Sequence, residues 1–383
     1  MRRSTDRILT THVGALPYPA DVWGEAGPDE SKMRAAAADI VARQRALGID
    51  FVNEGEVTKG GNWVTFINDR LTGFESAPTV GSVQLGMQSQ DWRSFPGFYK
   101  DATEGGTLFE QTRRAPSQTR RVDWSCTGPV TFVGQPQLAR EIEVFKSGLV
   151  EVPASDGFLT STAPTSIEAG RHNKHYATQE AFVEAIAEAM RVEYEAIAAA
   201  GLNVQVDDAW MAALWDRIGI PMGLESYTRF CHLRVEALNH ALRNVPVEQV
   251  RYHLCWGSWH GPHAFDIPLS DIVDVMLKVK AQVYLFEAAN ARHEHEFTVW
   301  DSVKLPDDKL IAPGVVTHST PLVEHPELVA LRIERFAQRV GCERVIASTD
   351  CGLGLRCHPE IAWAKLKSLA DGAAIASRRL WGR

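Results

Sequence analysis

Short apolar runs alternate with long amphipathic helical patterns along this chain of 383 residues. Such alternation is typical of repeated strand–helix units, which build a parallel sheet. Nine apolar runs predict strands, at residues 8–14, 50–56, 122–130, 157–164, 203–209, 252–257, 283–289, 310–318 and 345–352. The clearest helical patterns between them are at residues 31–48, 178–201, 268–281 and 325–341.

This repeat favours an eight-stranded barrel, because (β/α)8 barrels of about 250 residues or more form one domain. Nine candidate strands are one too many. We expect residues 157–164 to be the extra one, because they lie between two segments that already form a complete unit. Residues 75–120 lack clear periodicity, and we expect an excursion over the barrel mouth or an oligomer contact there. The sequence therefore predicts one α/β domain over residues 1–383, a single (β/α)8 barrel with an elaborated N-terminal half.

Charge and composition argue against several classes of protein. The formal net charge is −8 and no basic stretch stands out, which argues against nucleic-acid or anionic-membrane partners. We find neither an apolar run of about 18 residues nor an apolar region near the polar start, so we expect no membrane span and no signal peptide. Six cysteines in such a chain suit a reducing cytosol. We therefore expect a cytoplasmic protein with small-molecule partners, and a homo-oligomer is compatible with these features.

Ionisable and polar side chains stand at the carboxyl ends of the predicted strands. In (β/α)8 barrels these strand ends together form the active site. Burying such groups is costly unless they do chemistry or bind an ion. The residues concerned are His12, Glu54, Glu56, Thr127, Asp207, Asp208, His253, Cys255, Glu287, His318, Asp350 and Cys351.

His253 and Cys255 lie two positions apart on one predicted strand, so their side chains point to the same face. A second thiol, Cys351, follows another strand. Imidazole and thiolate ligands favour zinc over magnesium or calcium, which prefer oxygen. Three protein ligands with an open fourth position are typical of catalytic zinc. The alternative reading of this pair is a core cysteine beside a strand-end histidine, and the second strand-end thiol weakens that alternative.

Eight segments, in the same order, resemble the cobalamin-independent methionine synthase family, and in particular its short, single-barrel branch. The segments are THVGALP, VNEGE, CTGPVTF, VQVDDAW, RYHLCWG, VYLFEAANAR, IAPGVVTHS and STDCGLG. The resemblance implies a barrel of the methionine synthase and uroporphyrinogen decarboxylase type. It also implies Zn²⁺-dependent transfer of an alkyl group, with methyl favoured, to a small thiol such as homocysteine, which the zinc activates as a thiolate.

The resemblance implies a four-residue metal site. His253, Cys255 and Cys351 would hold the zinc. Glu287 would be a fourth ligand that yields its place to the substrate thiol. The alternative for Glu287 is an ion pair with Arg292.

The resemblance implies substrate-handling roles for other strand-end residues. Asp207 would hold the amino group of homocysteine, and Glu56 would lie near the substrates. His318 would act as general acid, a role that suits a side chain whose pKa lies near neutral pH. For each of the three, a structural hydrogen bond across the barrel mouth is the alternative. The remaining expected substrate-binding residues are His12, Val13, Gly14, Ala15 and Trp256.

Two departures argue against reduced folate as the alkyl donor. The chain has length for only one of the two barrels of full-length methionine synthases. After Gly-Pro-Val-Thr, the folate-using enzymes place a tryptophan that stacks on the pterin, whereas this chain has Phe132.

Two further functions stay open. The single-barrel branch includes the epoxyalkane:coenzyme M transferases, in which zinc chemistry opens an epoxide. The sulfonate of coenzyme M would need a cation, and the available side chains are Arg171, Lys174, Arg292 and Arg356. The second alternative is a non-catalytic barrel that binds zinc or a thiol. Residues 292–296 have the composition of a metal site, but their alternating charges favour a solvated ion-pair network.

Overall fold

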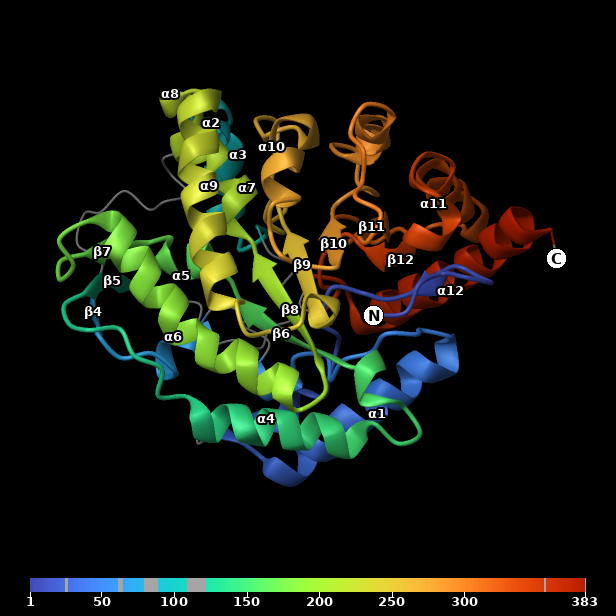
Figure 1. The fold of residues 1–383 in the computed structure, drawn as a ribbon, viewed down its shortest axis with the longest axis horizontal. Coiled ribbons are helices and arrows are strands. Elements are labelled where there is room, and N and C mark those ends of the chain that lie inside the picture. The colour runs from blue at the N-terminus through green and yellow to red at the C-terminus, as the bar shows by residue number, and fades with distance from the viewer. Residues whose placement is uncertain (25–26, 61–64, 79–88, 109–121, 355, 383) are drawn as a thin grey trace.

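The computed structural model describes residues 1–24, 27–60, 65–78, 89–108, 122–354 and 356–382 (Figure 1). Its main sheet has seven parallel strands in the order β1, β12, β11, β10, β9, β8, β6. In that order their bounds are Leu9–Thr10, Ile346–Thr349, Leu310–Val316, Val283–Phe286, Val250–Leu254, Asn203–Asp208 and Phe158–Thr162.

The sheet closes through the segment that comes after the first long helix. The main-chain N–H of Phe51 donates to the carbonyl of Thr10 at 3.1 Å. The next residue, Val52, forms a parallel bridge with Gly157, directly before β6. This segment therefore occupies the eighth position of a barrel, and the predicted (β/α)8 fold class is confirmed.

The prediction that residues 157–164 are the extra strand is wrong. β6 is buried at every residue and pairs with β8 inside the barrel. The extra strand is β5 (Val122–Cys126), which pairs antiparallel with β4 (Phe74–Pro78) and parallel with β7 (Arg171–Asn173) in a separate sheet. The physical reason lies in the alternation Val-Asp-Trp-Ser-Cys, which suits a strand with one solvated face rather than a barrel strand covered on both faces. Near the N-terminus, β2 (Trp23–Gly24) pairs antiparallel with β3 (Gly27–Pro28).

Long helices surround the sheet (Figure 1). They are α1 (Glu30–Leu47), α4 (Gln135–Gly148), α6 (Gln179–Ala199), α9 (Leu224–Ala241), α10 (Leu269–Met276), α11 (Pro326–Val340) and α12 (Pro359–Trp381). The helix ends obey local chemistry: Thr178 caps α6 by accepting the N–H of Ala181, and Gly48 ends α1 with φ of 90°. No helix in the described ranges is long and apolar enough to cross a membrane.

Short helical segments lie in the connections between the strands and the long helices. The α-helical ones are α2 (Gln90–Ser94), α3 (Pro96–Glu104), α5 (Pro164–Glu168), α7 (Trp210–Ala213) and α8 (Ile220–Met222). The 3-10 turns are η1 (Ala20–Val22), η2 (Val57–Lys59), η3 (Thr65–Asp69), η6 (Ala154–Asp156), η8 (Val247–Gln249), η9 (Glu294–Asp301) and η10 (Cys342–Arg344). A π-helical turn, η7, spans Trp215–Gly219.

Alternate residues of β10 enter two different cores. Val283 and Leu285 of β10 pack inside the barrel, whereas Tyr284 and Phe286 join the larger core between sheet and helices. β9 shows the same alternation, with Tyr252 packed against the helices. Its odd-numbered residues therefore point into the barrel, and this parity decides which strand-end side chains reach the mouth.

Candidate functional site

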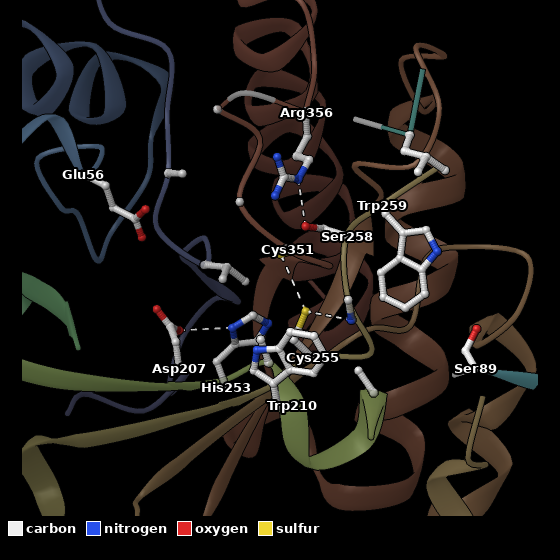
Figure 2. A pocket seen from close by; sticks show the side chains of 18 of the residues that line it. Glu56, Ser89, Asp207, Trp210, His253, Cys255, Ser258, Trp259, Cys351 and Arg356 are labelled. Carbon is white, nitrogen blue, oxygen red and sulfur yellow. Dashed lines mark hydrogen bonds and ion pairs between the residues drawn. The ribbon is translucent and has the colours of Figure 1, made fainter. Parts of the chain in front are cut away.

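The strands β9 and β12 bring three soft donor groups together. His253 is on β9, Cys255 comes just after its end and Cys351 comes just after β12 (Figure 2). One ligand atom from each of the three lies within 4.8 Å of the others. The two sulfur atoms are 3.9 Å apart. The structure therefore contains a possible metal site made of one imidazole and two thiols.

The surroundings of His253 fit a metal ion. Its Nδ1 is 3.1 Å from Oδ1 of Asp207, while its Nε2 is buried and finds no hydrogen-bond partner among the described residues. Metal-ligating histidines commonly use one ring nitrogen for a carboxylate and the other for the ion. An unpartnered imidazole nitrogen next to two sulfurs is a donor set that suits zinc.

The two thiols differ in acidity. Hydrogen bonding from Cys255 lowers the pKa of Cys351 to about 6, with further help from the charges of His253 and Arg356. The same sulfur–sulfur hydrogen bond, together with burial, raises the pKa of Cys255 well above its usual range. The pair therefore holds one readily formed thiolate next to His253, which is the form that binds a metal.

Glu287 lies next to the three donor residues but is not one of the group whose ligand atoms lie within 4.8 Å of one another. Its Oε1 accepts the main-chain N–H of Trp256 at 3.1 Å and lies 3.8 Å from the sulfur of Cys255. Its Oε2 accepts from the side chain of Asn290 at 2.7 Å. Burial raises the pKa of Glu287 to about 8. Within the described ranges no ion pair joins it to Arg292, whose Nη2 donates to a main-chain carbonyl instead.

A cavity of about 270 Å³ opens over the three donors. Figure 2 shows the thiol pair between Glu56 and Asp207 on one side and Trp259 and Ser89 on the other. The full lining is Val13, Ala15, Glu56, Ser89, Trp92, Tyr99, Leu108, Asp207, Ala209, Trp210, Ala213, Arg217, His253, Cys255, Gly257, Ser258, Trp259, Cys351, Gly352, Gly354 and Arg356.

Glu56 is held in an unusual backbone conformation at the cavity wall. Its φ of 60° and ψ of 23° are left-handed, which is uncommon outside glycine and often marks functional sites. Its Oε1 accepts the hydroxyl of Thr160 at 3.1 Å. A Cβ on Gly14 would come within 2.6 Å of the same oxygen, so the carboxyl group occupies space that only glycine leaves open. Burial raises the pKa of Glu56 to about 8.

The predicted substrate-handling side chains of His12, Trp256 and His318 do not line this cavity. Nε2 of His12 is 2.7 Å from Oε1 of Gln44, and burial lowers the pKa of His12 to about 3. Trp256 donates its indole N–H to the carbonyl of Ile267 at 2.7 Å. His318 is buried, which lowers its pKa well below the usual range. Their roles in substrate handling stay predictions.

The predicted main-chain anchor is only partly at the cavity. Val13 and Ala15 line it, and Gly14 lies against the carboxyl group of Glu56. The N–H of Val13 already donates to Oγ1 of Thr349 at 3.1 Å.

Of the four cationic side chains that the sequence offered, Arg356 lines the cavity, and the other three do not.

The structure adds three cavity-lining residues that the sequence did not indicate, namely Arg217, Trp92 and Tyr99. Arg217 lies on η7, and Trp92 and Tyr99 lie on α2 and α3, within the expected excursion. Residues 79–88 and 109–121 of that excursion lie outside the described residues. No local motif marks these three side chains.

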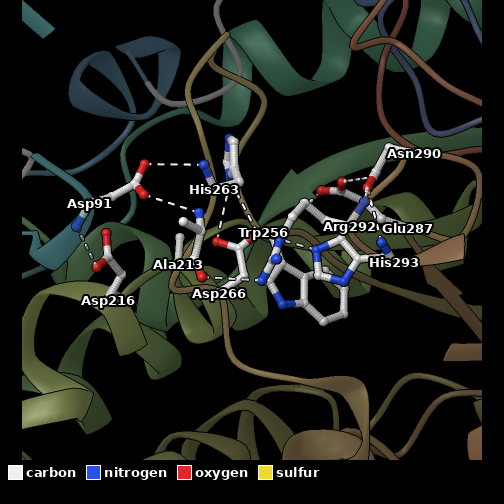
Figure 3. A network of polar contacts seen from close by, with 12 residues as sticks. Asp91, Ala213, Asp216, Trp256, His263, Asp266, Glu287, Asn290, Arg292 and His293 are labelled. Atoms are coloured by element: carbon white, nitrogen blue, oxygen red, sulfur yellow. Dashed lines mark hydrogen bonds and ion pairs between the residues drawn. The ribbon is translucent and has the colours of Figure 1, made fainter. Parts of the chain in front are cut away.

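A network of polar contacts joins Asp91, His263, Asp266 and His293 (Figure 3). Asp91 accepts the main-chain N–H groups of His263 and Ala264 at 3.1 and 3.0 Å, which ties α2 to the loop after β9. Asp266 contacts His263 and His293, each at 3.2 Å. His293 is 2% exposed, so the expected solvated network is wrong for this residue.

Two curated proteins resemble this chain in sequence. A methionine synthase of Thermococcus kodakarensis is 27% identical over 220 residues, which are 57% of this chain and 57% of that protein. A 5-methyltetrahydropteroyltriglutamate–homocysteine methyltransferase of Vibrio vulnificus is 22% identical over 382 residues, covering 96% of this chain and 41% of that protein. The chain thus spans about half the length of the curated relatives it matches.

The fold is shared with a solved structure. A B12-independent methionine synthase from Shewanella sp. W3-18-1, in complex with selenomethionine, superposes with a TM-score of 0.73 at 16% identity, covering 98% of this chain and 100% of that one. The family model of the cobalamin-independent synthase catalytic domain matches residues 147–374, which include all three soft donors and Glu287. The chain therefore belongs to the cobalamin-independent synthase family.

Proposed function

We propose that this protein is a zinc-dependent methyltransferase that methylates a small thiol, with homocysteine as the acceptor. The observation that carries the proposal is the imidazole nitrogen of His253, unpartnered among the described residues and buried beside the sulfurs of Cys255 and Cys351 at the wall of a cavity. Family membership supports the reaction class. The Shewanella relative binds selenomethionine, an analogue of methylated homocysteine, which supports the acceptor.

The proposed zinc would be held by His253, Cys255 and Cys351, with Glu287 near enough to Cys255 to serve as an exchangeable fourth ligand. When bound, Zn²⁺ lowers the pKa of a coordinated thiol, so that a thiolate nucleophile exists at neutral pH. Asp207 orients His253 through its 3.1 Å contact with Nδ1.

Several other residues would bind the acceptor, pair with its charged groups and supply a proton. Asp207 and Glu56 line the same side of the cavity, where they would receive the ammonium group of an amino acid. Val13, Gly14 and Ala15 lie at that side as well, close to Glu56. We keep His318 as the proposed general acid. Because its imidazole is neutral near pH 7, this role requires substrate binding to raise its pKa.

The alternative with a specific observation behind it is transfer to coenzyme M with opening of an epoxide. Arg356 lines the cavity, and its charge contributes to the lowered pKa of Cys351. A guanidinium so placed suits the sulfonate of coenzyme M. Phe132, which replaces the pterin-stacking tryptophan, is buried and does not line the cavity, which supports a donor other than reduced folate.

Turnover assays with the zinc-loaded protein test the proposal. Homocysteine is combined with several methyl donors, including methylated folate and methylcobalamin, and coenzyme M is combined with a short epoxyalkane. We expect methionine from at least one donor. Thioether formation only with coenzyme M and the epoxide would favour the alternative. Stoichiometric zinc without turnover in any pair would support a non-catalytic binding protein.

A further inference from the structure

Arg217 is a buried cation without an ion-pair partner in the described part of the chain. It is 7% exposed and lines the cavity. One terminal nitrogen, Nη1, donates to the carbonyl of Ala213, while Nε has no hydrogen-bond partner among the described residues. Burial of an unpaired charge is costly, so a guanidinium in this position calls for an explanation.

Two other buried arginines have carboxylate partners. Arg70 contacts Glu141 and Glu193 at 2.6 and 2.8 Å, and Arg234 contacts Glu168 at 2.6 Å. Those contacts satisfy the buried charge within the protein.

The acids near Arg217 are engaged elsewhere. Oδ1 of Asp216 accepts the main-chain N–H of Asp91 at 3.1 Å. Asp266 contacts the imidazoles of His263 and His293. Asp216 and Asp266 raise the pKa of Arg217 through their charges, but burial outweighs them and lowers it. Arg217 therefore keeps at least one N–H group, on Nε, without a hydrogen-bond partner among the described residues.

Two tryptophans pack against this guanidinium. Its central carbon lies 4.8 Å from the ring centre of Trp210 and 5.1 Å from that of Trp259. Trp259 is itself held by a 3.2 Å hydrogen bond from its Nε1 to the hydroxyl of Tyr99. Stacking covers the faces of a guanidinium and leaves its N–H groups, which lie in its plane, for an acceptor. Carboxylates and sulfonates match that edge.

The position of Arg217 relative to the thiols indicates which reactant it meets. Glu56 and Asp207, the proposed partners of the acceptor's ammonium group, lie on one side of the thiol pair, and Trp259 lies on the other (Figure 2). Arg217 packs against Trp259. We propose that Arg217 binds a carboxylate or sulfonate group on the alkyl donor. The inference rests on the proposed function for the identity of the two reactants.

Binding of a simple probe tests the inference without any transfer step. Benzoate and benzamide have the same ring and differ in the charge of one group, and their affinity for the zinc-loaded protein can be measured by titration calorimetry. We expect benzoate to bind at least about tenfold more tightly than benzamide, as one charge-assisted contact implies. Equal affinities for the two probes in the unmodified protein would overturn the inference.

Two substitutions assign the preference to this residue. Arg217→Gln should remove the benzoate preference while benzamide binding stays within about twofold, and Arg217→Lys should keep part of it because the charge remains. Arg356→Gln is the matched control, a second cationic residue of the same cavity whose loss should leave the preference in place. Loss of the preference in Arg356→Gln but not in Arg217→Gln would contradict the assignment.

The outcome is separable from the proposed function. If homocysteine is methylated but benzoate is not preferred, only the Arg217 inference fails. If benzoate is preferred but homocysteine is never methylated, only the proposed function fails. Zinc content and melting temperature establish that Arg217→Gln is folded, and should it not fold, the Arg217→Lys variant and the probe comparison in the unmodified protein still decide the matter.

Discussion

At the scale of single residues, the two sulfurs 3.9 Å apart are the most consequential pair in the molecule. The pKa of Cys351 is lowered and that of Cys255 is raised, so one thiolate forms readily beside one thiol. Binding of a metal ion would release the remaining proton. We expect Cys255→Ser and Cys351→Ser each to weaken zinc binding by more than about tenfold, because loss of even an outer-sphere partner commonly costs about 10–100-fold. Elemental analysis after dialysis measures the retained zinc.

Cys342→Ser is the control for this experiment. Cys342 is partly buried on η10 and belongs to no metal group among the described residues, so its variant should keep full zinc. Full zinc in both Cys255→Ser and Cys351→Ser would show that the ligand assignment is wrong.

Glu56 carries a second prediction at this scale. Its pKa is about 8 in the fold, against a reference value of 4.5, so the folded chain keeps a proton that the unfolded chain releases. Its contribution to stability is therefore present at low pH and is lost as pH rises through about 8. We expect Glu56→Gln to be more stable than the unmodified protein at pH 9, by about 2–4 kcal/mol, and to differ less at pH 6. Denaturant unfolding at the two pH values measures this.

The exposed residue Glu225 supplies the comparison for Glu56. Glu225→Gln should change stability by the same small amount at both pH values, because its side chain is 89% exposed. A Glu56→Gln effect that is likewise independent of pH would contradict the role of burial at Glu56.

At the scale of elements, strand parity explains which site predictions failed to reach the cavity. Residues 253 and 255 share the inward parity of β9, so the His-x-Cys pattern could be read from sequence. Trp256 has the opposite parity and faces the helices. His12 likewise stands one residue before the inward-facing Val13. Because side chains alternate between the two faces of a strand, residues one position apart point to opposite faces.

An irregularity in β11 makes the position of His318 hard to predict from a strand pattern. Leu310 and Ala312 point into the barrel, but the register shifts between Gly314 and Val316, and Val316 packs in the outer core. The shift ends the regular alternation of β11 before its last residue, and His318 lies two residues beyond the end of the strand. A bulge of this kind depends on how two strands fit together and has no local signature that would have revealed it.

Gly314 supplies the prediction for this scale. A Cβ there would overlap Oδ1 of Asp350 and lie 2.7 Å from its Cα, so β12 would have to move. Asp350 precedes Cys351 and accepts the N–H groups of Ala288 and Ala289, each at 2.8 Å. We expect Gly314→Ala to destabilise the protein by about 1–3 kcal/mol and to weaken zinc binding. Thermal unfolding and elemental analysis measure the two effects.

Gly97→Ala is the matched substitution. Gly97 lies in α3, and a Cβ there would meet nothing within 4 Å. Its change should be neutral or stabilising by up to about 1 kcal/mol. Equal behaviour of the two alanine variants would contradict the packing argument.

At the scale of the whole molecule, the fold class could be predicted from sequence, but the strands that close the barrel could not. The strand–helix repeat predicted the fold class because each unit has a local pattern. The choice between residues 157–164 and 122–130 depended on which strand reaches Val52 across the chain. The alternation at residues 122–126 was a local indication, but the pairing itself is a long-range contact. The same holds for Arg217, which meets Trp259 only after folding.

The proposed chemistry depends on a zinc ion that exchanges one ligand for the substrate thiol. X-ray absorption at the zinc edge, recorded with and without homocysteine, tests this most directly. We predict two sulfur ligands in the resting protein, from Cys255 and Cys351, and a third on addition of homocysteine, in place of an oxygen or nitrogen. An unchanged set of ligands at saturating homocysteine, in a preparation that forms methionine, would contradict the central claim.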